Sequence, residues 1–216
     1  MRPTFPTVAC LILGGMIPAA AQTGAKNGEW QTYGGDLGNT HYSPLDQINA
    51  GNFYKLQVVW RFKTDNLGPR PEFNFEGTPL MANGVVYSTA GTRRAVVAID
   101  AATGELTWTH GEREGARGSA APRILSGRGL SYWTDGGEER ILYVTPGYRL
   151  IALNAKTGAP VTSFGTNGVV DLKLDDDQQI DLVTGEVGLH AAPVVAGDTV
   201  IVGAAHRPGY PRARPT

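Results

Sequence analysis

The chain has 216 residues, of which 41% are hydrophobic and 18% charged, and its formal net charge is −1. This composition is ordinary for a soluble globular protein of one large domain or two small ones, and it excludes the strongly basic surface that nucleic-acid binding requires. The 29 glycines and 14 prolines favour many turns and few long helices. No nucleic-acid partner is expected, and basic pairs such as Arg93-Arg94 are interpreted as solvated turn residues.

Residues 1–21 are interpreted as a signal peptide. The apolar stretch 8–17 is too short to cross a bilayer, and the small residues 19–21 place cleavage before Gln22. An uncleaved membrane anchor is the alternative. We therefore expect an exported, periplasmic protein. Because Cys10 is the only cysteine and lies within this segment, the mature chain cannot form a disulfide bond with itself.

Residues 22–55 form an irregular lead-in segment with no helical or strand period. Aromatic and turn-forming residues gather between positions 28 and 49. The β-branched run Leu56–Phe62 follows and is interpreted as the final strand of a preceding structural unit, with Trp60 as its largest side chain.

A first strand-rich unit begins at Gly77. Asn83-Gly84 between two apolar runs predicts a tight hairpin, and the apolar run 95–100 predicts a further strand. Asp100 can accept backbone hydrogen bonds in the turn that follows, where Gly104 supplies a positive φ. Trp108 then lies in the next strand, so the unit predicts a four-stranded sheet.

The same pattern returns about fifty residues later, which is the repeat length of a propeller blade. The second unit contains the strands 140–144 and 149–154 and a Thr-Gly turn that ends at Gly158. A third unit begins at Ala191 and contains the hairpin signal Gly197-Asp198.

The run from Ala98 to Trp108, Ala-x-Asp-x-x-Thr-Gly-x-x-x-Trp, resembles the tryptophan-docking motif of quinoprotein dehydrogenases. These enzymes are eight-bladed β-propellers that bind pyrroloquinoline quinone (PQQ). The lead-in from Trp30 is similar too, and the resemblance extends to about residue 209. It implies an all-β fold, with two to three four-stranded blades of an eight-bladed propeller at 56–209 and the lead-in along the propeller edge.

An eight-bladed ring needs about 400 to 600 residues at about fifty or more per blade. The tail 210–216 is rich in proline and arginine and does not resemble the family. We therefore expect an N-terminal fragment that ends after a reading-frame shift and has no activity of its own. A genuine short protein is the alternative.

The resemblance also implies cofactor-binding residues. Glu76 precedes Gly77-Thr78-Pro79-Leu80, where the family has a glutamate that contacts the quinone. Arg128 precedes Gly129-Leu130-Ser131, where the family has an arginine, and a guanidinium suits the carboxylates of PQQ. His190 occupies a position where alcohol-oxidising members have a hydroxyl residue, and it could hydrogen-bond the cofactor. For each residue the alternative is a purely structural role.

Two other expectations concern metal and catalysis. Calcium is possible by family, but His206 stands near where the family has a calcium-ligating glutamate, and calcium needs several oxygen ligands. The family's catalytic aspartate lies in a later blade, so no catalytic residue is assigned in this chain. Asp175-Asp176-Asp177 is interpreted as a solvated loop.

The resemblance implies a PQQ-dependent dehydrogenase that oxidises an alcohol or sugar and passes electrons to a respiratory acceptor, either a quinone or a cytochrome. Because some alcohol dehydrogenases have an adjacent-cysteine disulfide and this mature chain has no cysteine, the glucose- or polyol-oxidising members are favoured over the methanol type. The alternative is a non-enzymatic propeller of PQQ-like repeats that acts as a binding or assembly scaffold.

Overall fold

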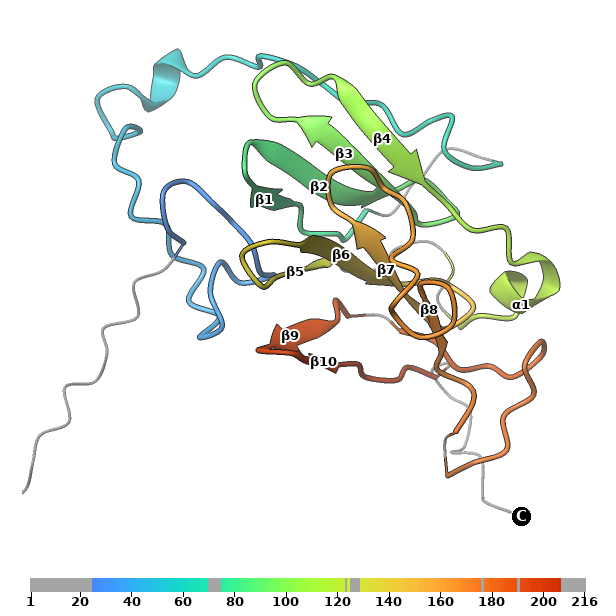
Figure 1. Ribbon diagram of the computed structural model, residues 1–216. Coiled ribbons are helices and arrows are strands. Elements are labelled where there is room, and N and C mark those ends of the chain that lie inside the picture. Colours follow the sequence, from blue (N-terminus) through green and yellow to red (C-terminus); the bar gives the residue numbers. More distant parts are fainter. Residues whose placement is uncertain are drawn as a thin grey trace, which may run out of the picture.

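A computed structural model describes residues 25–69, 75–122, 124, 129–175, 177–189 and 191–206. The interpreted signal peptide and the tail 210–216 lie outside these residues. The regular elements of the described chain are almost all antiparallel strands, joined by long loops and turns (Figure 1). The strands are β1 (Leu80–Ala82), β2 (Val85–Ala90), β3 (Ala95–Asp100), β4 (Leu106–His110), β5 (Ser131–Thr134), β6 (Glu139–Val144), β7 (Arg149–Asn154), β8 (Val169–Asp171), β9 (Val194–Ala196) and β10 (Thr199–Ile201). Two short helical turns accompany them, η1 (Phe53–Lys55) and α1 (Gly115–Ser119).

The strands form two four-stranded sheets and a hairpin. Strands β1-β2-β3-β4 pair in chain order as blade 1, strands β5-β6-β7-β8 pair in chain order as blade 2, and β9 pairs with β10. This meander confirms the predicted all-β, partial-propeller fold. The third unit forms only its first hairpin among the described residues.

The predicted hairpin turns are present. Asn83 and Gly84, with φ of 51° and 78°, join β1 to β2, and this pair of left-handed residues matches the twist of the strands. Gly197, with φ of 60°, lies in the turn between β9 and β10. The tight turns therefore fix the register of both hairpins locally.

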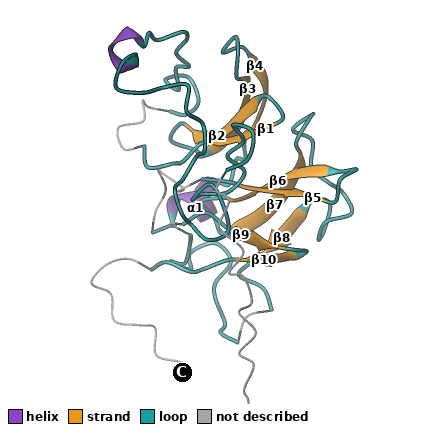
Figure 2. Ribbon diagram, turned by 90° about the vertical axis from the view of Figure 1, so that its left-hand side faces the viewer, coloured by secondary structure: helices purple, strands orange, loops and turns teal. Residues whose placement is uncertain are grey.

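The units stack face to face, as Figure 2 shows from the side. Apolar side chains pack between them. Blade 1 contributes Tyr87 and Val96, and blade 2 contributes Ile141 and Tyr143, to one buried core between the two sheets. A second core lies between blade 2 and the β9–β10 hairpin. Because each blade buries one face against the next, the units stack in chain order.

Each predicted docking tryptophan contacts the next unit along the stack. The Trp108 indole N–H donates to the Ala155 carbonyl at 2.9 Å, and its ring covers Gly158. The Trp60 indole N–H donates to the Ala101 carbonyl at 3.0 Å, and its ring covers Gly104. The two contacts repeat one geometry, so Trp60 relates to blade 1 as Trp108 relates to blade 2.

The prediction of a strand at Leu56–Phe62 is wrong for the described structure. The segment has no strand assignment and no ladder to another described strand. Trp60 and Phe62 instead pack against blade 1, while Arg61 between them is exposed. The alternation is that of a strand, but a strand also needs a neighbouring strand to receive its hydrogen bonds.

The lead-in begins along the free edge of β1. The backbone N–H of Trp30 donates to the Met81 carbonyl at 2.8 Å, and the Met81 N–H donates to the Trp30 carbonyl at 2.9 Å. The Glu29 carboxylate accepts the Asn83 N–H at 3.0 Å. The lead-in thus forms backbone hydrogen bonds with the strand β1 at one edge of blade 1.

Candidate functional site

The segments that lead into the first strand of each unit lie side by side. We call the end of the blades at which β1, β5 and β9 begin the proximal end. Thr78 and Gly129 form a parallel bridge there, and the Ser131 hydroxyl donates to the Pro193 carbonyl. The three stretches that carry the predicted cofactor residues therefore meet at one end of the molecule.

The structure describes one of the three predicted residues. Glu76 is partly buried at the proximal end, two positions before Thr78. Arg128 and His190 lie outside the described residues, although their neighbours Gly129 and Leu189 lie within them.

Gly129 shows how closely two of these segments approach. Its φ is 135°, and a Cβ atom added there would lie 3.0 Å from the Thr78 carbonyl oxygen. A side chain at position 129 would push the two segments apart, so a glycine is required for this approach. The carboxylate of Glu76 and a guanidinium at position 128 are the kinds of donor and acceptor that a cofactor with ring N–H and carboxylate groups needs.

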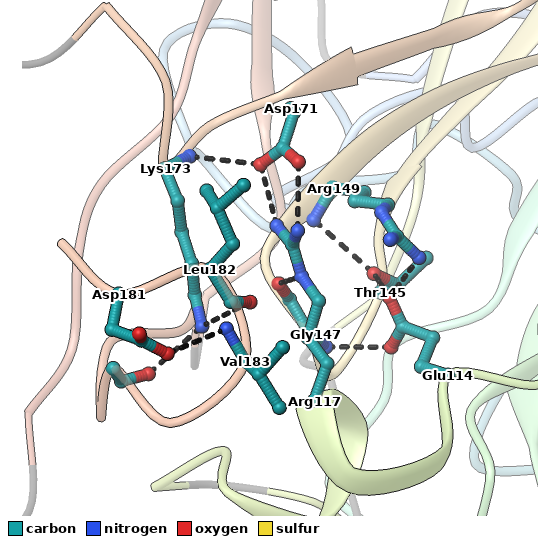
Figure 3. A network of polar contacts seen from close by, with 11 residues as sticks. Glu114, Arg117, Thr145, Gly147, Arg149, Asp171, Lys173, Asp181, Leu182 and Val183 are labelled. Carbon is teal, nitrogen blue, oxygen red and sulfur yellow. Dashed lines mark hydrogen bonds and ion pairs between the residues drawn. The ribbon is translucent and has the colours of Figure 1, made fainter.

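A buried ionic network ties α1 to blade 2 at the proximal end (Figure 3). Arg117 is 6% exposed and donates to both oxygens of Asp171, at 2.7 and 2.5 Å, and to the Gly147 carbonyl at 2.7 Å. Glu114 accepts the Thr145 hydroxyl at 2.7 Å and the Gly147 N–H at 2.6 Å. The network fixes the connection between the two blades on its way to position 128.

Sequence reasoning missed a third Thr-Gly turn, Asp181 to Gly185, although its signal was readable in the sequence. Asp181 accepts the Val183 and Thr184 N–H groups at 2.9 and 2.6 Å, as Asp100 does in blade 1. The ammonium of Lys173, which is 3% exposed, donates to the Gly185 carbonyl at 2.8 Å. These bonds order the connection from β8 towards position 190.

The interpretation of Arg93-Arg94 as solvated turn residues holds for Arg93 and is wrong for Arg94. Arg93 is exposed, whereas Arg94 is 2% exposed. Burial lowers the pKa of Arg94 to about 10, against the opposing effect of the Glu114 carboxylate, so the guanidinium stays charged at neutral pH. The turn between β2 and β3 points this side chain inward because blade 2 packs against it.

Two cavities adjoin these elements. One of about 440 Å³ lies at the proximal end, lined among others by Pro69, Arg93, Glu114, Ile124 and Pro146. Another of about 340 Å³ lies between the lead-in and the strands β5 and β9, lined among others by Thr32, Leu37, Tyr132, Pro193 and Val195. The first borders both segments that run on to positions 76 and 128.

Two kinds of feature are absent from the described residues. Within the described ranges, no group of three or more His, Cys, Asp or Glu side chains could hold a metal ion. Within the same part of the chain, no helix is long and apolar enough to cross a membrane.

Comparison with known families decides the identity of this fold. The profile of the PQQ family described as "Glucose/ethanol/alcohol dehydrogenase, beta-propeller domain" matches residues 30–216. The chain belongs to this family. It is 38% identical to the dehydrogenase subunit of alcohol dehydrogenase (quinone) from Gluconobacter oxydans over 151 residues, which cover 68% of this chain and 18% of that protein.

Two further relatives agree with the assignment. Quinate/shikimate dehydrogenase (quinone) from Acinetobacter baylyi is 32% identical over 197 residues, covering 82% of this chain and 24% of that protein. The crystal structure of the quinohemoprotein alcohol dehydrogenase from Comamonas testosteroni superposes with a TM-score of 0.65 at 28% identity, over 86% of this chain and 24% of that one. The chain thus spans about a fifth to a quarter of the length of these relatives.

Proposed function

We propose that this chain forms the first blades of a PQQ-dependent dehydrogenase that oxidises an alcohol or a sugar. When bound, the quinone supplies the oxidising chemistry, and a respiratory quinone or cytochrome takes the electrons onward. Membership of the PQQ propeller family supports the reaction class. We further propose that the protein is exported to the periplasm, on the strength of the interpreted signal peptide.

The observation that carries the proposal is the close approach of Thr78 and Gly129. It brings the segment that follows Glu76 beside the residue that follows position 128, which supports the proposal that an acceptor and a cationic donor from two blades act on one ligand. Residues from several blades must contribute to one ligand when the site lies on the axis of a propeller. We propose that Glu76, Arg128 and His190 contact the cofactor, and that a bound calcium ion, if the enzyme uses one, takes its ligands elsewhere.

A polyol or sugar substrate is the finer proposal. Relatives named quinoprotein glucose dehydrogenase and glycerol dehydrogenase large subunit, from Gluconobacter oxydans, are 29% and 30% identical over 82% of this chain. The absence of cysteine after position 10 also separates this chain from members with an adjacent-cysteine disulfide.

The first test is a PQQ titration of the purified chain, followed by quenching of tryptophan fluorescence. We expect Glu76→Gln to weaken binding about tenfold, because a charge-assisted hydrogen bond contributes roughly 1.5–3 kcal/mol. Glu105→Gln is the matched control, since Glu105 is exposed in a turn at the opposite end of blade 1. Equal PQQ affinity in both variants would contradict the role of Glu76.

A further inference from the structure

Arg94 is a charged side chain buried in a place where a turn residue would normally face water. It follows the exposed Arg93, has a φ of 53°, and is 2% exposed. Burying a guanidinium is costly unless its N–H groups find acceptors, so a buried arginine indicates specific partners.

Its partners belong to different units of the stack. One terminal nitrogen of Arg94, Nη1, donates to the Val144 carbonyl at 3.0 Å and to the Leu189 carbonyl at 3.3 Å. Val144 is the last residue of β6 in blade 2, and Leu189 precedes the β9–β10 hairpin. One side chain of blade 1 therefore spans blade 2 and reaches the segment that begins the third unit.

Among the described residues, three backbone hydrogen bonds also hold the segment 187–189. The Val187 N–H donates to the Gly185 carbonyl at 3.0 Å, and Gly188 exchanges two backbone bonds with Ala205. Val187 and Leu189 are buried in the second core. Their packing holds the segment against blade 2. The hydrogen bond from Arg94 to the Leu189 carbonyl links the same segment to blade 1.

We propose that Arg94 is a positioning residue that holds the segment 187–189 at a set distance from the segment of blade 1 that carries Glu76. The proposal rests on the proposed function, because the cofactor roles of Glu76 and His190 belong to it. An arginine suits this geometry, since the N–H groups of its planar Nη1 have fixed directions toward the two carbonyls, whereas a lysine ammonium is a compact point charge on a flexible stem.

The experiment compares Arg94→Gln, Arg94→Lys and the neighbouring control Arg93→Gln in the full chain. Amide hydrogen exchange is measured at Val187 and Gly188, with Ile141 and Ile151 of the blade 2 sheet as internal references. We expect exchange at Val187 and Gly188 to rise at least about tenfold in Arg94→Gln and less in Arg94→Lys, with the references unchanged. Arg93→Gln should match the parent chain.

Two results would overturn the proposal. Unchanged exchange at Val187 and Gly188 in both Arg94 variants would show that the segment does not depend on this side chain. An equal rise at Ile141 and Ile151 would show that Arg94 serves general stability and does not position one segment. Should Arg94→Gln fail to fold, Arg94→Lys decides between these outcomes.

A parallel PQQ titration separates this inference from the proposed function. We expect Arg94→Gln to lose at least about tenfold in PQQ affinity, with partial recovery in Arg94→Lys and parental affinity in Arg93→Gln. Parental affinity in Arg94→Gln would refute the link between Arg94 and the cofactor. Absence of PQQ binding in the parent chain would refute the proposed function, while exchange would still decide whether Arg94 holds the segment.

Discussion

At the scale of single residues, Gly104 shows why a position covered by a docked tryptophan ring accepts no side chain. The φ of Gly104 is 77°, and a Cβ atom there would lie 2.5 Å from the Trp60 ring. Gly84 has nearly the same φ, 78°, but nothing lies within 4 Å of its added Cβ. The pair separates the effect of backbone conformation from the effect of the tryptophan contact.

We expect Gly84→Ala to lower the free energy of unfolding by about 1 kcal/mol, from the left-handed backbone alone. Gly104→Ala should cost about 1–3 kcal/mol more, because the ring of Trp60 must move out of its contact. Urea unfolding of both variants measures the difference. Equal losses would mean that the docked ring moves away without cost.

Asp171 gives a pH dependence with a definite sign. Burial raises the pKa of its carboxyl, but the hydrogen bonds from Arg117 and from the Lys173 N–H, together with the charges of Arg117 and Arg149, outweigh this and hold the pKa below its usual range. A carboxyl whose pKa is lower in the folded chain stabilises it above the unfolded-state pKa, and this contribution is lost as the pH falls through the folded-state pKa.

Asp171→Asn should therefore be less stable than the parent at neutral pH, and the difference should shrink below about pH 4. Urea midpoints from about pH 3 to pH 7 measure it. The exposed Asp177→Asn is the control and should leave the curve unchanged. A constant difference across this range would rule out titration of Asp171 as its cause.

At the scale of elements, α1 is a five-residue helix that forms because of its anchors. Its sequence Gly-Ala-Arg-Gly-Ser contains two glycines, and no side-chain cap closes its start. Arg117 within it and Glu114 before it make buried bonds to the β6–β7 turn and to β8. Tertiary contacts therefore stabilise this helix, although its own helix propensity is weak.

Arg117→Met should lower the free energy of unfolding by about 3 kcal/mol, because it leaves the Asp171 carboxylate without its bidentate partner. Arg140→Met removes an ion pair to Glu138, whose side chain is 60% exposed, and should cost less than about 1 kcal/mol. Thermal unfolding of the two variants tests the contrast. Similar losses would show that burial does not strengthen the Arg117 pair.

At the scale of the whole molecule, the exposed apolar side chains gather on the lead-in and the segment after it. Between positions 37 and 59 they are Leu37, Tyr42, Leu45, Ile48, Phe53, Tyr54, Leu56, Val58 and Val59. Blades in a propeller protect such faces and edges by closing on their neighbours. A surface of this kind favours association when nothing covers it.

We expect the purified chain to associate as its concentration rises, as measured by sedimentation velocity. Val59→Lys should weaken the association, because Val59 is 84% exposed beside the docked Trp60. Val183→Lys is the control, since Val183 is 47% exposed in a distant loop. A monomer at all concentrations would show that this surface does not drive association.

The sequence by itself determined the features that depend on near neighbours in the chain. The left-handed turns at Gly84 and Gly104, the strand pairs that they join and the repeat length all follow from local backbone preference. These local features are enough to predict the blade fold and to recognise the family resemblance. The choice of Glu76 as a candidate cofactor residue came from the family resemblance.

Only the tertiary structure decided the burial of Arg94, the missing ladder at Leu56–Phe62 and the anchoring of α1. Arg93 and Arg94 are alike in sequence, yet one faces water and the other reaches Val144 and Leu189 across two units. Which turn residue is buried depends on what packs against it from far along the chain. A pattern of hydrophobicity in one segment carries no information about that partner.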